Sequence, residues 1–404
     1  MGDFFQNGVV ATLHKLRDRP LEELEAELLG FSSVRPMTLV LPSLFSELEG
    51  PALANILDEI SVVPYLDEIV IGLDKATEEQ FRYAQDYFDR LPQHHRILWN
   101  DGPRLRALDK ELAKERLAPK EMGKGRNVWF CFGYTIASAR SQVVALHDCD
   151  ILTYSRELLA RLCYPIANPT FSYQFCKGYY PRVTEDRMHG RVCRLLVWPL
   201  IRALTRVLGP IDFLEYLNSF RYPLAGEFSF RSEAIKEIRI PSDWGLEIGV
   251  LAEVHRNHAA KHRCQIEIAE TYDHKHQPLS AESMEAGLSK MSIDIAKTFY
   301  RKLSTNGIVF YPETFRTIKS TYYRIALDYV DMYDNDARLN GIRLDRHAEE
   351  KTVELFAANL MHAGEAYLEN PTDLPMIPCW SRVASAIPDF LERMHEAVEE
   401  DNAR

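Results

Sequence analysis

The chain has 404 residues, of which 46% are hydrophobic and 26% are charged, and this composition predicts one large or two ordinary globular domains. Its formal net charge of -11 at pH 7 argues against a nucleic-acid-binding surface, because phosphate binding depends on a surplus of Lys and Arg. The 7 cysteines never form a Cys-x-x-Cys pair, which favours a reducing, cytoplasmic environment over a disulfide framework or a zinc site.

The first half of the chain alternates between strand-like and helix-like patterns. Residues 1–36 are expected to form an N-terminal helical segment, since leucines recur at helical spacing after Pro20. Strands are predicted at Met37–Pro42, Glu68–Gly72, Arg96–Trp99 and Val143–His147, and helices at Glu49–Ile60, Thr77–Leu91 and Arg126–Ala139. This alternation predicts an α/β fold in which a mostly parallel sheet is flanked by helices and binds ligands beyond the carboxyl ends of its strands.

The second half is less regular. A strand at Thr170–Tyr173, a helix at Arg191–Val207 and a strand at Gln265–Ala269 indicate a half-domain built on the same sheet. The most apolar long stretch, Leu195 to Ile211, is broken by proline and arginines and predicts no membrane span. Beyond Pro278 the chain is strongly helical, and the predicted helices are Met284–Tyr300, Pro312–Asp331 and Ala348–Leu368. We expect a C-terminal helical extension for packing or oligomer contacts.

The strand at Val143–His147 ends in Asp148-Cys149-Asp150. Alternate side chains of a strand share a face, so Asp148 and Asp150 are expected to point to one side, where they could hold a hard cation. Taken alone, the triplet is better explained as ordinary turn chemistry, because Asp favours the start of loops.

Two glycine-rich stretches precede predicted helices. Gly123-Lys124-Gly125 is similar to a phosphate cradle but is not a P-loop, because Arg126 replaces the Ser or Thr that would hold magnesium; a solvated turn is the alternative. Gly190-Arg191 adds a bidentate cation to a helix N-terminus, which suits a phosphate or carboxylate, and an ordinary surface cap is the alternative.

Two acids and a histidine complete the candidate residues. Pro223–Glu227 and Trp244–Gly249 each place a carboxylate beside glycine in an apolar setting, which is costly unless the acid has a partner or a task. Glu227 and Glu247 are otherwise turn or helix-start acids. His274 arrives at a strand end, as the two aspartates do, although a lone His is usually structural.

Taken together and in this order, these stretches resemble the glucosyl-3-phosphoglycerate synthase family of GT-A glycosyltransferases over roughly residues 36–280. The matching stretches are Val40–Pro42, Gly123–Gly125, Asp148–Asp150, Lys177 with Tyr179 and Tyr180, Gly190–Val192 with Pro199 and Leu200, Pro223–Glu227, Gly245–Gly249, and His274 before Pro278 and Leu279. The resemblance implies a nucleotide-diphospho-sugar transferase (Rossmann-like) fold. Residues 37–150 would form its nucleotide-sugar-binding half, residues 151–280 its acceptor-binding half, and residues 281–404 the helical extension.

The resemblance also implies an activity and a site. The activity is the metal-dependent, retaining transfer of glucose from UDP- or GDP-glucose to 3-phosphoglycerate. Asp150 would bind Mg2+ or Mn2+ directly, Asp148 would contact the ribose or the metal, and His274 would complete the ligand set. The residues implied as catalytic are Asp150, Glu247 and Glu227. The nucleotide-sugar side comprises Pro42, Ser43, Leu44, Glu47, Asp74, Lys124, Asp148 and Cys149, and the acceptor side comprises Lys177, Gly190, Arg191, Cys193, Glu227 and His276.

The chain departs from the family pattern at several of these positions. Leu44 to Glu47 stands where Asn-Glu is common, and Gly72-Leu73-Asp74 stands where Asp-Ser-Gly is usual, which leaves the donor nucleotide open. Cys193 replaces a typical Thr and removes a hydroxyl donor, and His276 replaces a common Asn, so the acceptor is also open.

Several alternatives therefore stay open from the residues alone. The first is transfer of mannose, or transfer to plain glycerate. The second is a haloacid-dehalogenase-type phosphatase, although Leu152 stands where that motif wants Thr or Val. The third is a non-catalytic nucleotide-sugar-binding protein. The family often forms homodimers, and the physiological role remains open between compatible-solute synthesis and a polysaccharide primer.

Overall fold

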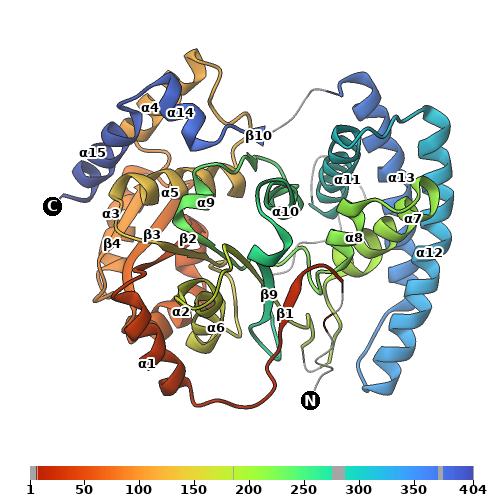
Figure 1. Ribbon diagram of the computed structural model, residues 1–404, viewed down its shortest axis with the longest axis horizontal. Coiled ribbons are helices and arrows are strands. Elements are labelled where there is room, and N and C mark those ends of the chain that lie inside the picture. The colour runs from red at the N-terminus through yellow and green to blue at the C-terminus, as the bar shows by residue number, and fades with distance from the viewer. Residues whose placement is uncertain (1–5, 7, 185, 275–286, 372–375, 404) are drawn as a thin grey trace.

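The computed structural model describes residues 6, 8–184, 186–274, 287–371 and 376–403. Its centre is an eight-stranded sheet with the strand order β1-β9-β6-β7-β5-β2-β3-β4 (Figure 1). The strands are β1 (Ala11–Leu13), β2 (Met37–Leu44), β3 (Leu66–Asp74), β4 (His95–Trp99), β5 (Val143–Leu146), β6 (Phe175–Tyr179), β7 (Phe228–Arg231) and β9 (Arg263–Glu267). Every pairing in this sheet is parallel except those of β7 with β5 and β6. This confirms the predicted mostly parallel α/β sheet.

The strand directions bring the candidate residues to one edge of the sheet. β2, β3 and β5 run the same way, with Val40 opposite Leu146 and Leu44 opposite Asp74, so their carboxyl ends meet. The antiparallel strand β7 begins at this edge, immediately after Glu227. Glu227, which precedes its strand, therefore lies at the same edge as Asp148 and Asp150, which follow theirs.

Helices cover both faces of the sheet, and the strand residues alternate between two cores. Leu39 and Leu41 of β2 belong to the core formed with α1 (Leu21–Ser32), α2 (Pro51–Ser61), α3 (Glu78–Phe88) and α6 (Arg156–Ala167). Val40 belongs to the other core, with α4 (Pro103–Lys114) and α5 (Lys124–Ser138). Short elements complete this part: η1 (Phe45–Glu49), α9 (Ser232–Ile235) and η3 (Ala260–His262).

A second group of helices lies beside the sheet, on the right of Figure 1. It contains a π-helix, η2 (Val192–Val197), followed by α7 (Trp198–Leu208), α8 (Asp212–Asn218), α11 (Gly287–Thr305), α12 (Pro312–Leu339) and α13 (Arg346–Glu369). Helix α10 (Leu246–Asn257) lies between this group and the sheet. After α13 the chain crosses to the opposite end of the molecule. There β10 (Met376–Ile377) pairs with β8 (Ile240–Pro241), and α14 (Trp380–Ala386) and α15 (Phe390–Asn402) follow. Trp380 stacks on Trp129 of α5 with ring centroids 3.9 Å apart, which fixes this end of the chain to the sheet domain.

Two predicted elements are wrong. The N-terminal segment is not helical throughout, because Ala11–Leu13 adds a parallel strand beside β9, and the Gln6 side chain bonds both Thr12 N and Thr12 O. The strand predicted at Thr170–Tyr173 begins later, at Phe175. Asn168 Oδ1 accepts hydrogen bonds from the Thr170 N–H and hydroxyl, which bends the chain into a turn before the strand.

The remaining predicted strands and helices are found with small shifts at their ends. The helix predicted from Met284 begins, within the described residues, at Gly287 and runs to Thr305. No helix in the described ranges is long and apolar enough to cross a membrane.

Glu68 is a buried acid that lies outside the candidate site. Glu68 of β3 is fully buried, and its Oε2 accepts hydrogen bonds from Thr38 at 3.4 Å and Ser138 at 3.1 Å. His94 Nε2 lies 3.7 Å from the other oxygen. Burial raises the pKa of Glu68 to about 7.

Glu68 should make the stability of the fold depend on pH. Because its folded pKa lies above the unfolded value, the fold favours the protonated acid; this stabilisation is fully present below about pH 4.5 and is lost as pH rises through about 7. We expect Glu68→Gln, which resembles the protonated acid, to match the wild type at pH 4 and to exceed it by about 3 kcal/mol at pH 8. Urea unfolding at both pH values measures this, with the exposed Glu79→Gln as the control. Equal stability of Glu68→Gln and wild type at pH 8 would refute the assignment.

Candidate active site

The centre of the candidate site is an ion pair between Lys124 and Asp148. Lys124 lies in the first turn of α5, and its Nζ is 2.5 Å from Asp148 Oδ1 and 3.4 Å from Glu247 Oε1. Burial disfavours both charges, but their attraction outweighs it, raising the pKa of Lys124 and lowering the pKa of Asp148 below their usual values. The pair is therefore charged and brings together the residues of three separate predicted stretches.

Gly226 lies against this pair. A Cβ atom at Gly226 would fall 2.5 Å from Asp148 Oδ2, closer than real contacts allow, and 3.0 Å from Lys124 Nζ, which is tighter than most. The loop containing Gly226 is fixed from below by Lys177 of β6, whose buried ammonium donates to the Ala225 carbonyl. Burial lowers the pKa of Lys177 to about 8. Lys177 was predicted to contact the acceptor substrate. In the structure its ammonium instead supports the loop beside the ion pair.

Glu227 is completely buried, and both of its oxygens have partners. Tyr180 donates to Oε2 at 2.6 Å and Tyr272 donates to Oε1 at 2.5 Å, and the two tyrosine rings stack with centroids 3.6 Å apart. Burial and then the charge of Asp148 raise the pKa of Glu227. Each oxygen of Glu227 already accepts one hydrogen bond from a tyrosine. A substrate hydroxyl could therefore donate only to a remaining lone pair of these oxygens.

Asp150 and His274 face each other across the edge of the sheet. His274 Nδ1 lies 3.9 Å from Asp150 Oδ2, and a β-bridge between Ile151 and His274 holds the two segments together. Arg182 Nη1 donates to His274 Nε2 at 2.5 Å, so Nε2 accepts and Nδ1 of the neutral ring carries the proton that faces Asp150. Burial and then the charge of Asp148 raise the pKa of Asp150 to about 7.

These two side chains fit a divalent cation. Carboxylate oxygen and imidazole nitrogen are ligands of Mg2+ or Mn2+, and 3.9 Å is less than twice a metal–ligand distance of about 2.1 Å, so one ion could contact both once it replaces the Nδ1 proton and the contact of Nε2 with Arg182 is released. Within the described residues no three His, Cys, Asp or Glu side chains lie close enough to hold an ion by themselves. The arrangement therefore suits an ion that shares its coordination with a bound anion.

The other residues predicted for the nucleotide side lie along the same edge. Pro42, Ser43 and Leu44 end β2, and Glu47 follows in η1. Cys149, which separates the two aspartates in the sequence, is buried. Asp74 ends β3, where it accepts a hydrogen bond from Asn100 Nδ2 at 2.8 Å and lies 3.9 Å from Arg126 Nη1. Burial raises the pKa of Asp74 to about 6.

The residues predicted for the acceptor side lie on the loop and helix that follow β6. Gly190 has a φ of 74°, and a Cβ there would lie 3.4 Å from Arg182 Cβ, so the loop folds back beside the arginine that contacts His274. Arg191 begins the helical turn, and Cys193 is fully buried within the π-helix. His276 lies outside the described residues.

Sequence reasoning missed three side chains that organise this site. Tyr272 precedes His274 by two residues, so a strand-like period could have placed both on one face. Arg182 and Glu349 have no local signal. Glu349 lies in the helical extension and pairs with Arg191, with Oε1 2.7 Å from Arg191 Nε.

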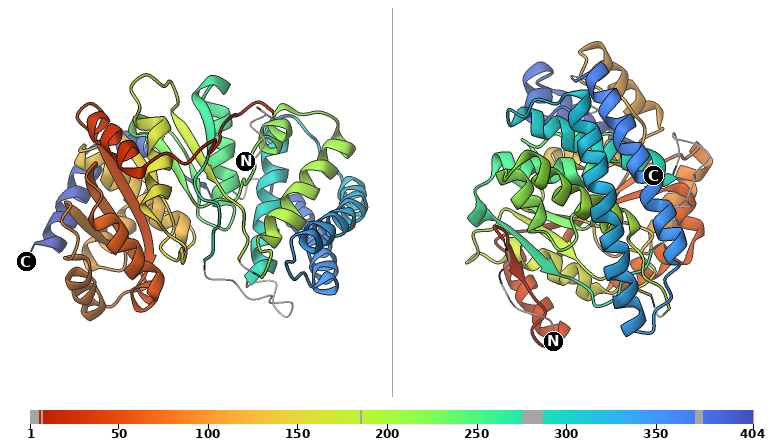
Figure 2. Two further views of the ribbon diagram at one scale, coloured as in Figure 1. Left: turned by 90° about the horizontal axis from the view of Figure 1, so that it is seen from below. Right: turned by 90° about the vertical axis from the view of Figure 1, so that its right-hand side faces the viewer.

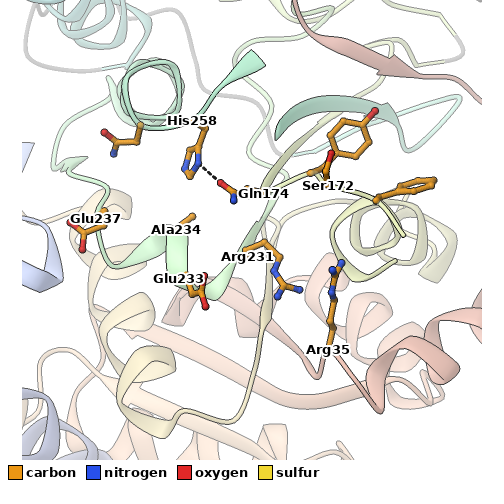
Figure 3. A pocket seen from close by; sticks show the side chains of 11 residues that line it. Arg35, Ser172, Gln174, Arg231, Glu233, Ala234, Glu237 and His258 are labelled. Atoms are coloured by element: carbon orange, nitrogen blue, oxygen red, sulfur yellow. Dashed lines mark hydrogen bonds between the residues drawn. The ribbon is translucent and has the colours of Figure 1, made fainter. Parts of the chain in front are cut away.

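A cavity of about 500 Å³ lies at the opposite edge of the sheet, near the starts of β5 and β6 (Figure 3). Arg35, Arg231, Glu233, Gln174 and His258 are among the residues that line it, and His258 Nδ1 lies 2.6 Å from Gln174 Oε1. None of the predicted site residues lines this cavity.

No family model matches the chain, but the curated relatives all carry the name of one family. The chain is 45% identical over 403 residues, covering 100% of both chains, to a glucosyl-3-phosphoglycerate synthase of Persephonella marina. It is 40% identical over 400 residues, 98% of this chain and 97% of the relative, to a glucosyl-3-phosphoglycerate synthase of Methanococcoides burtonii.

Solved structures share the fold at low identity. Glucosyl-3-phosphoglycerate synthase from Mycobacterium tuberculosis, in complex with Mn2+, UDP-glucose and phosphoglyceric acid, is 22% identical with a TM-score of 0.51, over 72% of this chain and 87% of that one. Mannosyl-3-phosphoglycerate synthase from Rubrobacter xylanophilus is 21% identical with a TM-score of 0.54, over 74% and 83%.

The mostly parallel sheet and these comparisons define a glycosyltransferase of the GT-A fold. Within that class, full-length identity shows that the chain belongs to the glucosyl-3-phosphoglycerate synthase family.

The contact between Gly226 and the ion pair gives a prediction. We expect Gly226→Ala to lower kcat/KM for glycosyl transfer by about 100-fold while the protein still folds, since a displacement of about 1 Å at a reacting site can cost this much. Steady-state kinetics and thermal unfolding measure the two effects. Gly30→Ala in α1 is the control, because a Cβ there meets nothing within 4 Å. Full activity of Gly226→Ala would show that the ion pair tolerates displacement.

Proposed function

We propose that this protein transfers glucose from UDP-glucose to the free hydroxyl of 3-phosphoglycerate, with retention of the α configuration and with the help of Mg2+ or Mn2+. The observation that carries the proposal is the meeting of Asp150 and His274, 3.9 Å apart, beside the charged pair of Lys124 and Asp148. Identity to glucosyl-3-phosphoglycerate synthases over the whole chain supports the reaction. The M. tuberculosis enzyme, crystallised with UDP-glucose and Mn2+ or with UDP and Mg2+, supports the donor and the cofactor.

The donor diphosphate is the anion that the site is built to receive. A cation bound by Asp150, His274 and diphosphate oxygens would offset the negative charge that builds on the leaving nucleotide. Lys124 adds a second positive charge at a fixed position, since Asp148 and Glu247 hold its ammonium from two sides. Asp148 remains ionised and holds Lys124 in place, and it is also placed to contact the ribose.

The acceptor approaches from the side of Gly190 and Arg191. Arg191 provides a planar guanidinium for the acceptor phosphate, and the helix that begins there adds free N–H groups. Glu247, whose Oε1 contacts Lys124, is placed to orient a hydroxyl of the glucose or the glycerate.

Retention is best explained by attack on the same face as the leaving group. A double displacement needs a carboxylate free to attack the anomeric carbon. Glu227 has both oxygens hydrogen-bonded by tyrosines, and Glu247 is engaged by Lys124, so neither is prepared for that role. The leaving diphosphate can itself accept the proton of the attacking hydroxyl.

The family assignment leaves a narrower set of alternatives than the sequence did. A phosphatase and a non-catalytic binder do not belong to this family of transferases. Transfer of mannose from GDP-mannose is the second candidate, because the R. xylanophilus mannosyl-3-phosphoglycerate synthase has the same fold. GDP-glucose as donor and plain glycerate as acceptor remain open.

A cytoplasmic location and a homodimer are part of the proposal. The first is supported by the cysteines, all of which are free thiols, six of them buried. The second is supported by large apolar side chains exposed on α12 and the segment before it: Val309, Tyr311, Tyr323, Met332 and Leu339.

A panel of donors and acceptors tests the function. UDP-glucose, GDP-glucose and GDP-mannose are each combined with 3-phosphoglycerate and with D-glycerate, with and without Mn2+ or Mg2+, and the anomeric form of the product is read by NMR. We expect UDP-glucose with 3-phosphoglycerate to give the α-linked product, and chelation of the metal to stop turnover until Mn2+ or Mg2+ is restored. Absence of metal-dependent transfer with every pair would reject the proposal.

Asp150→Ala tests the metal site. We expect it to abolish turnover and to weaken Mn2+ binding in the presence of UDP, because His274 alone then remains from the pair of protein ligands. Electron paramagnetic resonance titration measures Mn2+ binding, and circular dichroism confirms the fold. Asp18→Ala, at a carboxylate whose side chain is 94% exposed, is the control. Unchanged Mn2+ affinity in Asp150→Ala would remove Asp150 from the ligand set.

A further inference from the structure

A buried carboxylate of the helical extension holds the arginine of the acceptor side. Glu349 of α13 has a side chain that is only 2% exposed. Its Oε1 lies 2.7 Å from Arg191 Nε, and its Oε2 lies 2.7 Å from Arg194 Nη1. Arg191 and Glu349 are 158 residues apart in the chain, so this contact is a product of the tertiary fold.

The two arginines are held differently. The Arg194 side chain is 5% exposed, donates from Nε to the His189 carbonyl at 2.8 Å, and stacks over the Tyr333 ring at 4.9 Å. The Arg191 side chain is 34% exposed, and Glu349 engages only its Nε. The terminal nitrogens of Arg191 carry four further N–H groups in the geometry that matches a phosphate. Arg194 is thus structural, while Arg191 is anchored at one edge and has donors to spare at the other.

The helical extension also shapes the turn that carries Arg191. Pro199 has no N–H for the carbonyl four residues earlier, Leu195, and the helix widens into a π-helix at this point. Tyr322 of α12 donates to that carbonyl at 2.6 Å. The right panel of Figure 2 shows α12 and α13 as two long blue helices side by side, and both contact η2.

A second contact joins the loop that precedes Arg191 to the turn between α12 and α13. Arg343, between α12 and α13, donates from its backbone N to the Asp186 carbonyl at 2.9 Å, and forms a parallel β-bridge with Arg187. The side chains of Arg343 and Asp186 form an ion pair. The extension therefore holds the loop before Arg191 and the helix after it.

We propose that Glu349 is a positioning residue for the acceptor: it fixes the Arg191 guanidinium so that its terminal N–H groups meet the phosphate of a phosphomonoester acceptor. The inference rests on the proposed function, in which Arg191 binds that phosphate. One carboxylate shared by two arginines leaves the cluster with one net positive charge, so Glu349 orients Arg191 without cancelling the attraction for a phosphate dianion.

The main test is Glu349→Gln, assayed with and without the acceptor phosphate. We expect KM for 3-phosphoglycerate to rise about tenfold or more, as loss of a charged hydrogen bond implies, with little change in kcat or in KM for the donor. Transfer to D-glycerate, driven at high concentration, should be unchanged. A purely structural role would not separate the two acceptors. Glu350→Gln is the control, because Glu350 is the next residue and pairs with Arg346 at the surface.

A second variant covers the case in which loss of the charge on Glu349 prevents folding, since Arg194 would be buried without a charged partner. Arg191→Lys keeps the positive charge at a half-exposed position but cannot reproduce the Nε contact and the planar terminal donors together. We expect the same rise in KM for 3-phosphoglycerate alone. Calorimetric binding of 3-phosphoglycerate gives a readout that is independent of turnover.

The outcomes separate this inference from the proposed function. No transfer to 3-phosphoglycerate by the wild type would reject the function itself. An unchanged KM in Arg191→Ala, with an active wild type, would remove Arg191 from the phosphate site. A normal or lowered KM in Glu349→Gln, with a raised KM in Arg191→Ala, would overturn the role of Glu349 alone, and a lowered KM would show that Glu349 competes with the phosphate. A rise confined to 3-phosphoglycerate supports the proposal.

Discussion

The partly buried ion pair between Lys124 and Asp148 is the interaction on which the rest of the site depends. A charge that loses part of its contact with water needs a partner, and here an ammonium lies between Asp148 and Glu247 at 2.5 and 3.4 Å. This requirement favours glycine at residue 226, since a Cβ there would press on both side chains of the pair. It also explains the buried Lys177, which fixes the loop of Gly226 through the Ala225 carbonyl.

The charges around this pair leave the site short of positive charge. Asp148 is ionised, and its field, added to burial, raises the pKa of both Asp150 and Glu227. The two acids respond differently. Glu227 is satisfied by two tyrosine hydroxyls and belongs to the rigid base of the site. Asp150 faces His274 at the edge, where a cation and the diphosphate it accompanies can supply the compensation that the protein does not.

Local patterns in the sequence predicted what is local in the structure. The strands and helices from Met37 to Leu146 follow one another along the chain, so periodicity alone was sufficient to find the parallel sheet and the edge with Asp148. Pairings between distant segments left no such signal. The strand at Ala11–Leu13 forms because β9 lies beside it, and β7 runs antiparallel, which brings Glu227 to the edge from the opposite direction. The tyrosines on Glu227 come from positions 45 and 47 residues away.

The helical extension shows the same limit most clearly. Its three long helices were predicted, but only as a packing or oligomer surface, because a helix pattern does not reveal what a single buried acid contacts. A carboxylate inside a protein is rarely the most stabilising choice, since an apolar side chain of similar size avoids the cost of desolvation. Glu349 is therefore better explained by what it holds than by what it adds to stability. It places one arginine, Arg191, at the boundary between the interior and the acceptor side, and it joins a segment outside the GT-A sheet to the chemistry at the edge of that sheet.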